Sequence, residues 1–136
     1  MDEVVEMLGP RKAVRLAVSV PFHSSMLTEA SKGFAEVLAE TEIRDPAFPI
    51  VCNVDAAPVR NAAEVRDALA RQFANSVRWQ ESVEWMLNDA GVRSFVECGP
   101  KPTLTKMVGQ IASPLGIDDL ETASVCDRAG LEALQS

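Results

Sequence analysis

Long apolar runs and a basic start are both missing from this sequence. No stretch approaches the about 20 consecutive apolar residues that a membrane-spanning helix needs, so we expect no membrane association. The first residues, Met1-Asp2-Glu3, are acidic, whereas a secretory signal begins with basic residues followed by an apolar run. These two observations lead us to expect a cytoplasmic protein.

Basic residues are few and do not gather into a patch. The densest group is Arg11, Lys12 and Arg15, while the whole chain carries a net charge of −7 and has a pI of about 4.7. Phosphate backbones and anionic surfaces repel such a chain at long range. Nucleic acid is therefore not an expected partner.

Cysteine pairs are also absent. The three cysteines, Cys52, Cys98 and Cys126, are odd in number and show no C-x-x-C spacing, so they predict neither a disulfide framework nor a zinc site. We expect no metal and no bound cofactor. Their apolar or small neighbours predict buried free thiols, as in a reducing cytoplasm.

The remaining pattern is that of a layered α/β domain, and 136 residues suit one domain. Apolar periodicity predicts alternating strands and helices. The residues at 50–52 (IVC) are continuously apolar, which is typical of a parallel strand buried on both faces. The expected elements are a helix at 2–8, a strand at 13–20, a helix at 25–41, a strand at 50–52, helices at 62–74 and 79–90, a strand at 94–98, a helix at 102–112, a strand at 121–126 and a helix at 128–135.

Three turns follow predicted strands, at 21–25, 53–55 and 99–101. Ligands in open α/β sheets gather at the carboxyl ends of strands. The first turn contains His23, the only histidine in the chain. A lone histidine is more often a surface or capping residue, but this position and the titration of imidazole near neutral pH also suit a general base.

Four blocks carry a resemblance to a known family. They are residues 18–27 (VSVPFHSSML), 50–55 (IVCNVD), 70–79 (ARQFANSVRW) and 95–101 (FVECGPK). In this order and spacing they resemble the malonyl-CoA:acyl-carrier-protein transacylases, and specifically the C-terminal portion of that family. The resemblance implies the C-terminal part of an α/β-hydrolase-like layered domain, with a short, mostly parallel sheet flanked by helices. Residues 1–20 would be the last helix and strand of a small ferredoxin-like subdomain that is otherwise largely absent, and 21–136 would belong to the large domain.

The same resemblance implies roles for three residues. His23 matches the histidine base that activates an acyl-accepting serine. Gln72 matches the residue whose backbone carbonyl orients that histidine, although a polar residue late in an exposed helix fits equally well. Phe22 resembles the bulky residue of malonyl-selective members, although simple hydrophobic packing also explains it.

The family also implies substrates and partners. Its members transfer a malonyl group from coenzyme A, through an acyl-serine, to the phosphopantetheine thiol of acyl carrier protein in fatty-acid or polyketide biosynthesis. The turn at 99–101 is interpreted as a plain strand-to-helix connection, with Lys101 as a minor candidate for holding a phosphate of the phosphopantetheine or carrier protein.

The expected nucleophile is missing, because the sequence contains no Gly-x-Ser-x-Gly. Ser24 and Ser25 are too near His23 along the chain and suit helix capping instead, and Cys52 and Cys98 lie in apolar strands where thiol reactivity falls. Three readings stay open: a histidine-bearing half whose partner is the missing N-terminal half of the enzyme, a non-catalytic interaction module, or an inactive truncated fragment. On the first reading, apolar surface should be exposed around the first and second strands.

Overall fold

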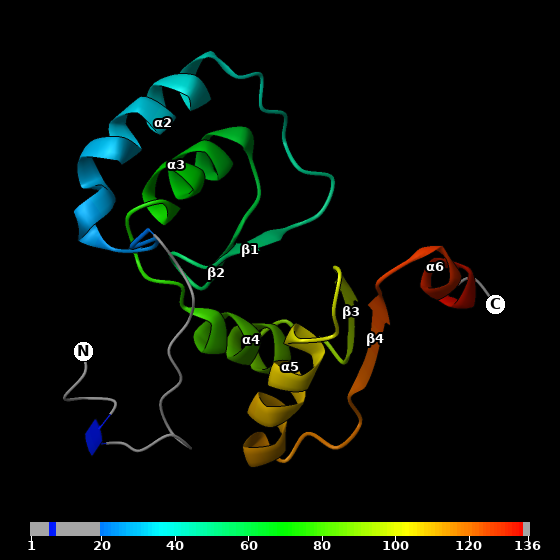
Figure 1. Ribbon diagram of the computed structural model, residues 1–136. Coiled ribbons are helices and arrows are strands. Elements are labelled where there is room, and N and C mark those ends of the chain that lie inside the picture. The colour runs from blue at the N-terminus through cyan, green and yellow to red at the C-terminus, as the bar shows by residue number, and fades with distance from the viewer. Residues whose placement is uncertain (1–5, 8–19, 135–136) are drawn as a thin grey trace.

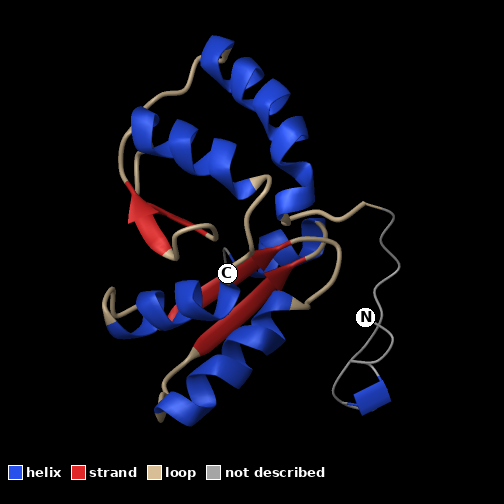
Figure 2. Cartoon of the chain, turned by 90° about the vertical axis from the view of Figure 1, so that its left-hand side faces the viewer, coloured by secondary structure: helices blue, strands red, loops and turns tan. Residues whose placement is uncertain are grey.

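The computed structural model describes residues 6–7 and 20–134 of the chain. The strand expected at 13–20 and most of the helix expected at 2–8 lie outside these residues. The division into parts at residue 20 therefore stays a prediction. Within the described residues the elements form two groups, which Figures 1 and 2 show one above the other.

The first group holds two helices over a small hairpin. Its elements are the 3-10 helix η1 (Ser25–Leu27), α2 (Thr28–Glu40), β1 (Ile50–Cys52), β2 (Ala57–Val59) and α3 (Ala62–Gln72). Helix α2 packs against α3, where the rings of Phe34 and Phe73 lie 5.6 Å apart between centroids. Val65 and Ala68 of α3 pack onto the hairpin, which gives this group a small core of its own.

The second group is a two-stranded parallel sheet with helices packed on it. Its elements are α4 (Trp79–Asn88), β3 (Ser94–Cys98), α5 (Leu104–Ala112), the 3-10 helix η2 (Ser113–Leu115), β4 (Glu121–Val125) and α6 (Arg128–Leu134). Strands β3 and β4 pair in parallel. Val83 and Leu87 of α4 are fully buried against Val108 of α5, with Phe95 of β3 packed beside them. This arrangement confirms the expected α/β class and a short parallel sheet flanked by helices.

Local sequence explains where the helices begin and end. The side chain of Asn61 accepts a hydrogen bond from the backbone N–H of Glu64, and so caps α3 as expected. Gly91, at φ +66°, follows α4 in the left-handed conformation that glycine adopts most easily. Helix α5 begins two residues later than expected, because the Glu97 carboxylate binds the N–H groups of Thr103 and Thr105 and leaves Pro102 outside the helix.

The expectation of a parallel strand at 50–52, buried on both faces, is wrong. Strand β1 pairs antiparallel with β2, which the sequence pattern did not predict, and Ile50 is 39% exposed. The four residues between the strands form a turn in which Ala56 has φ +53° and the chain reverses. Pro58 obscured β2, since a proline has no backbone N–H and is accepted only at edges of sheets.

Candidate functional site

The turn at Val20–Ser24 holds His23 in an unusual backbone conformation. His23 has φ +57°, in the left-handed region that few residues other than glycine occupy and in which histidine is enriched among the exceptions. The turn is closed by two hydrogen bonds, from Phe22 N–H to the Val20 carbonyl (2.8 Å) and from the Ser24 hydroxyl to the Pro21 carbonyl (2.9 Å). Because strained backbone positions cluster at functional sites, the conformation of His23 makes this turn a candidate functional site.

The imidazole of His23 meets the end of helix α3. Its Nδ1 lies 3.1 Å from the backbone oxygen of Gln72, the last residue of that helix. The last four carbonyls of a helix have no partner within it, so this oxygen is free to accept. A carbonyl can only accept, and the hydrogen bond therefore requires the proton on Nδ1 and leaves the lone pair of Nε2 free. The structure thus brings together two of the three residues that the sequence singled out.

The residues next to His23 differ in exposure and in their hydrogen bonds. Phe22 is 58% exposed. The Ser24 oxygen accepts a hydrogen bond from the Met26 N–H at 3.3 Å and so caps η1, which agrees with the capping role expected from the sequence. Ser25 is exposed and begins η1, where its carbonyl accepts from the Thr28 hydroxyl at 2.7 Å.

The cysteines divide into two kinds. Cys52 is buried, and burial, followed by the charge of Asp55, raises the pKa of its thiol. The expectation that all three thiols are buried is wrong for Cys98 and Cys126, which are exposed. Cys98 shares the exposed side of β3 with Val96, since alternate residues of a strand point to opposite faces and Phe95 and Glu97 are the half-buried ones.

A cluster of charged residues links the turn at 53–55 to the C-terminal end of α3. The guanidinium of Arg71 binds both carboxylate oxygens of Asp55, at 2.7 and 2.5 Å, and its Nε donates to Asp67 at 2.8 Å. The hydrogen bond from Arg71 holds the pKa of Asp55 below its usual range. Arg71 directly precedes Gln72, so the turn at 53–55 is connected to the carbonyl that faces His23.

Sequence reasoning singled out neither Asp55 nor Arg71 for a role. A signal was present, because Asp55 ends a turn that follows a strand and Arg71 lies in the block that contains Gln72. What the sequence does not contain is their pairing, since 16 residues separate them. Only the fold of the hairpin onto α3 brings the two charges together.

The turn at 99–101 connects the end of β3 to the start of α5. Desolvation tends to raise the pKa of Glu97, but hydrogen bonds from the backbone of Thr105, Leu104 and Thr103 and from the Thr105 hydroxyl outweigh it, and the pKa is lowered overall. Lys101 is exposed beside this cap. The arrangement agrees with a strand-to-helix connection.

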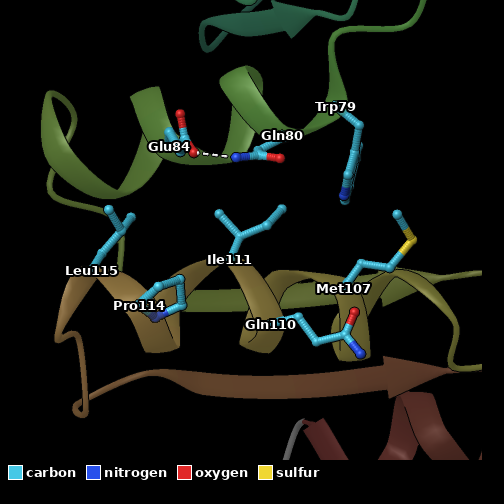
Figure 3. Close-up of a pocket in the computed structure, with 8 residues that line it drawn as sticks. All are labelled: Trp79, Gln80, Glu84, Met107, Gln110, Ile111, Pro114 and Leu115. Carbon is cyan, nitrogen blue, oxygen red and sulfur yellow. Dashed lines mark hydrogen bonds between the residues drawn. The ribbon is translucent and has the colours of Figure 1, made fainter. Parts of the chain in front are cut away.

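Two hollows flank these elements. A groove of about 490 Å³ lies between α4 and α5, and Figure 3 shows apolar side chains of both helices facing into it. Its lining residues are Trp79, Gln80, Glu84, Met107, Gln110, Ile111, Pro114 and Leu115. A second hollow, of about 340 Å³, lies between α2 and α3 and is lined in part by Ser25, Arg71 and Asn75, which places it next to the histidine turn.

The described residues contain neither a candidate metal cluster nor a candidate membrane-spanning helix. Within 6–7 and 20–134, no three His, Cys, Asp or Glu side chains come together in a way that would hold a metal ion. Over the same residues, every helix is too short or too polar to cross a bilayer.

Comparison with known sequences identifies relatives. No family model matches the chain. It is 32% identical over 125 residues to the malonyl CoA-acyl carrier protein transacylase of Staphylococcus aureus strain COL, covering 90% of this chain and 40% of that protein. It is 35% identical over 127 residues to the protein of the same name from Haemophilus influenzae, covering 93% and 39%. The chain therefore spans about 40% of the length of the curated relatives it matches.

Comparison with solved structures agrees. The acyl-carrier-protein S-malonyltransferase of Burkholderia pseudomallei 1710b matches with a TM-score of 0.83 and 39% identity, over 98% of this chain and 42% of that one. The corresponding enzyme of Vibrio cholerae matches with a TM-score of 0.82 and 35% identity, over 97% and 41%. A malonyl-transacylase in complex with its type II polyketide acyl-carrier protein matches with a TM-score of 0.82 and 37% identity, over 96% and 40%. Over the part that it matches, the chain is similar to the malonyl-CoA:acyl-carrier-protein transacylases.

Proposed function

We propose that this chain supplies the histidine base for transfer of a malonyl group from coenzyme A to the phosphopantetheine thiol of acyl carrier protein. The observation that carries the proposal is the contact between Nδ1 of His23 and the Gln72 carbonyl, because it presents Nε2 as a proton acceptor. The relatives support the chemistry, since they are named malonyl transacylases and one of them is seen with an acyl-carrier protein.

The first half-reaction follows from this geometry. Nε2 of His23 takes the proton of a serine hydroxyl while the serine oxygen attacks the malonyl thioester carbonyl. The bond from carbon to sulfur then breaks, and the coenzyme A sulfur takes the proton back from Nε2 of His23 and leaves as a thiol. The transient imidazolium lies at the carbonyl end of α3, where a helix dipole stabilises a positive charge by about 0.3–1 kcal/mol at an exposed site.

The second half-reaction repeats these steps in reverse order. His23 takes the proton of the phosphopantetheine thiol, whose sulfur attacks the malonyl-serine ester, and the serine oxygen recovers the proton as it leaves. No bound cofactor is needed for either half. We also propose that Phe22, which precedes His23 in the sequence, narrows the space around the α-carbon of the acyl group.

We assign the serine to a complementary segment, equivalent to part of the relatives' length that this chain does not match. The chain contains no Gly-x-Ser-x-Gly, and the Ser24 hydroxyl is committed to its own turn. Apolar side chains are available to such a segment: Phe48 and Ile50 at the second predicted strand are 73% and 39% exposed, and Val96 of β3 is 48% exposed. The first predicted strand lies outside the described residues. The cytoplasm, where free thiols persist, suits all three cysteines.

Reconstitution tests the proposal. The chain is co-expressed with the unmatched segment of the Vibrio cholerae enzyme, which on this proposal supplies the serine, and malonyl transfer to acyl carrier protein is followed by intact mass. We expect transfer by the pair, and its loss by at least about a hundredfold in His23→Asn, the usual range for removing a general base. Asparagine tolerates the left-handed backbone and keeps a donor toward Gln72, so its effect isolates the missing base.

Three outcomes would contradict the proposal. Unchanged transfer by the His23→Asn pair would remove the role of His23 as a base. A malonyl adduct on the isolated chain after incubation with malonyl-CoA would show that the nucleophile lies within it. A pair that assembles with all its variants folded but never transfers malonyl would instead favour the non-catalytic interaction module.

A further inference from the structure

We infer that Asp55 is a positioning residue for His23, and that it acts through Arg71 and the backbone carbonyl of Gln72. The inference rests on the proposed function in one respect, because the proposed function gives His23 its role as a base. Its geometry extends over three segments that are distant in sequence: the turn after β1, the end of α3 and the histidine turn.

The first link is the ion pair between Asp55 and Arg71. Both oxygens of the carboxylate accept from the two terminal nitrogens of the guanidinium, at 2.7 and 2.5 Å. A two-point contact of this kind fixes direction as well as distance, which a single contact does not. It therefore holds the last turn of α3 in one orientation relative to the hairpin.

The second link fixes Asp55 itself. Its backbone N–H donates to the Cys52 carbonyl at 3.3 Å, and its backbone carbonyl accepts from Nη1 of Arg78 at 3.0 Å. The backbone N–H of Arg78 also donates to the Asn53 carbonyl at 2.9 Å. The turn is thus tied both to β1 and to the start of α4, so Asp55 is an anchor rather than a mobile surface side chain.

The third link is the helix end. Helix termini fray, and the final carbonyls of α3 are held by side chains instead of helical N–H groups. Nδ2 of Asn75 donates to the Arg71 carbonyl at 2.6 Å, and Nδ1 of His23 meets the Gln72 carbonyl at 3.1 Å. Because Arg71 and Gln72 are adjacent, holding the Arg71 side chain also limits where the Gln72 carbonyl can point. Loss of the Asp55 carboxylate should let the Gln72 carbonyl change direction, and His23 should then lose its preference for the Nδ1-protonated tautomer.

The chain has one histidine, which makes a direct test possible. The complete chain is labelled with 15N, and the Nδ1 and Nε2 shifts report which ring nitrogen carries the proton, at a pH of about 8.5 where an ordinary imidazole is neutral. The variant is Asp55→Asn. The matched control is Asp67→Asn, which removes the other carboxylate that Arg71 binds, one located within α3 itself.

We expect the Nδ1-protonated form to dominate in the wild type. In Asp55→Asn its ratio to the Nε2-protonated form should fall by about fivefold, the change that loss of one hydrogen bond of ordinary strength produces. Asp67→Asn should leave the ratio within twofold of the wild type. The double variant Asp55→Arg with Arg71→Asp exchanges the two charges and should recover at least half of the decrease in the tautomer ratio seen in Asp55→Asn. A role of Asp55 limited to folding would not produce this recovery.

Two results would overturn the inference. One is an equal ratio in Asp55→Asn and Asp67→Asn, with circular dichroism showing both folded. The other is failure of the charge exchange to restore the ratio in a folded double variant. Failure of the proposed function is separable, since it shows as absent malonyl transfer by a pair whose His23 keeps the Nδ1 proton.

Discussion

At the scale of single residues, the candidate site is defined by how His23 is held. A left-handed backbone costs about 1–3 kcal/mol for a residue with a Cβ, so the surrounding contacts must outweigh it. The turn hydrogen bonds of Phe22 and Ser24 and the side-chain contact to Gln72 supply that support. The backbone directs the ring to the end of α3, and the helix carbonyl then selects the protonated nitrogen.

Phe22 permits a test of selectivity in the reconstituted pair. We expect Phe22→Ala to lower the preference for malonyl over methylmalonyl by about tenfold, which is the lower end of the discrimination that a pocket achieves between substrates differing by one methylene. The physical reason is removal of the ring that would clash with an α-methyl group. Competition between the two coenzyme A thioesters, read by mass of the carrier product, measures it. Phe22→Leu serves as the control that keeps bulk, and an unchanged preference in Phe22→Ala would leave hydrophobic packing as the residue's role.

At the scale of elements, α3 is the part that organises the site. Its first turn is capped by Asn61, the N–H of Ala62 donates to Asp45 at 2.8 Å, and its last turn presents Gln72 to His23. A short helix gains little from propensity alone, so its ends and its packing determine whether it persists. The cap at one end therefore supports the carbonyl at the other.

The cap of α3 can be tested by substitution. Asn61→Ala should lower the free energy of unfolding by about 1 kcal/mol, because the N–H of Glu64 loses its acceptor. Asn61→Asp retains an acceptor and should remain close to the wild type. Urea unfolding followed by circular dichroism measures both. If the alanine variant proved as stable as the aspartate variant, the cap would not stabilise the helix.

At the scale of the whole molecule, polar contacts join two small cores among the described residues. One lies under α3 and contains Cys52 and Val59, and the other lies between α4 and α5 and contains Leu87. Arg78 connects the two groups, since it is the N-cap residue of α4 and donates hydrogen bonds to the turn after β1. Ionised side chains thus contribute to how the two halves are held together.

The ionised carboxylates of Asp55 and Glu97 predict acid sensitivity. The pKa values of Asp55 and Glu97 are lowered in the fold, so the unfolded chain binds more protons than the folded one as pH falls. Their stabilisation is present above the unfolded-state pKa and is lost as pH falls through the folded-state pKa. We expect the urea midpoint to fall between about pH 5 and pH 3.

Variants separate this effect from general acid unfolding. Asp55→Asn should be less stable than the wild type at neutral pH and should lose less on acidification, because it has no carboxyl to protonate at this position. The exposed Asp118→Asn is the control and should follow the wild type. Parallel pH dependence in wild type and Asp55→Asn would contradict the proposed contribution of the ion pair.

The sequence by itself determined the local elements. The cap at Asn61, the glycine after α4 and the apolar periods of α4 and β3 are short-range signals, because each depends on neighbours within a few residues. The sequence also singled out His23, Gln72 and Phe22, through their resemblance to a family. It failed at 50–59, where a turn with positive φ at Ala56 and a strand containing Pro58 produce a hairpin.

Only the tertiary structure decided what brings distant residues together. His23 and Gln72 are 49 residues apart, and Asp55 and Arg71 are 16 apart, so neither contact leaves a local period in the sequence. Exposure was likewise decided by packing: Cys98 lies on the side of β3 opposite Phe95, the residue that packs against α4 and α5, although its apolar neighbours predicted burial. Residue type and short-range spacing set which elements form, whereas the direction of a carbonyl or a carboxylate depends on how those elements pack.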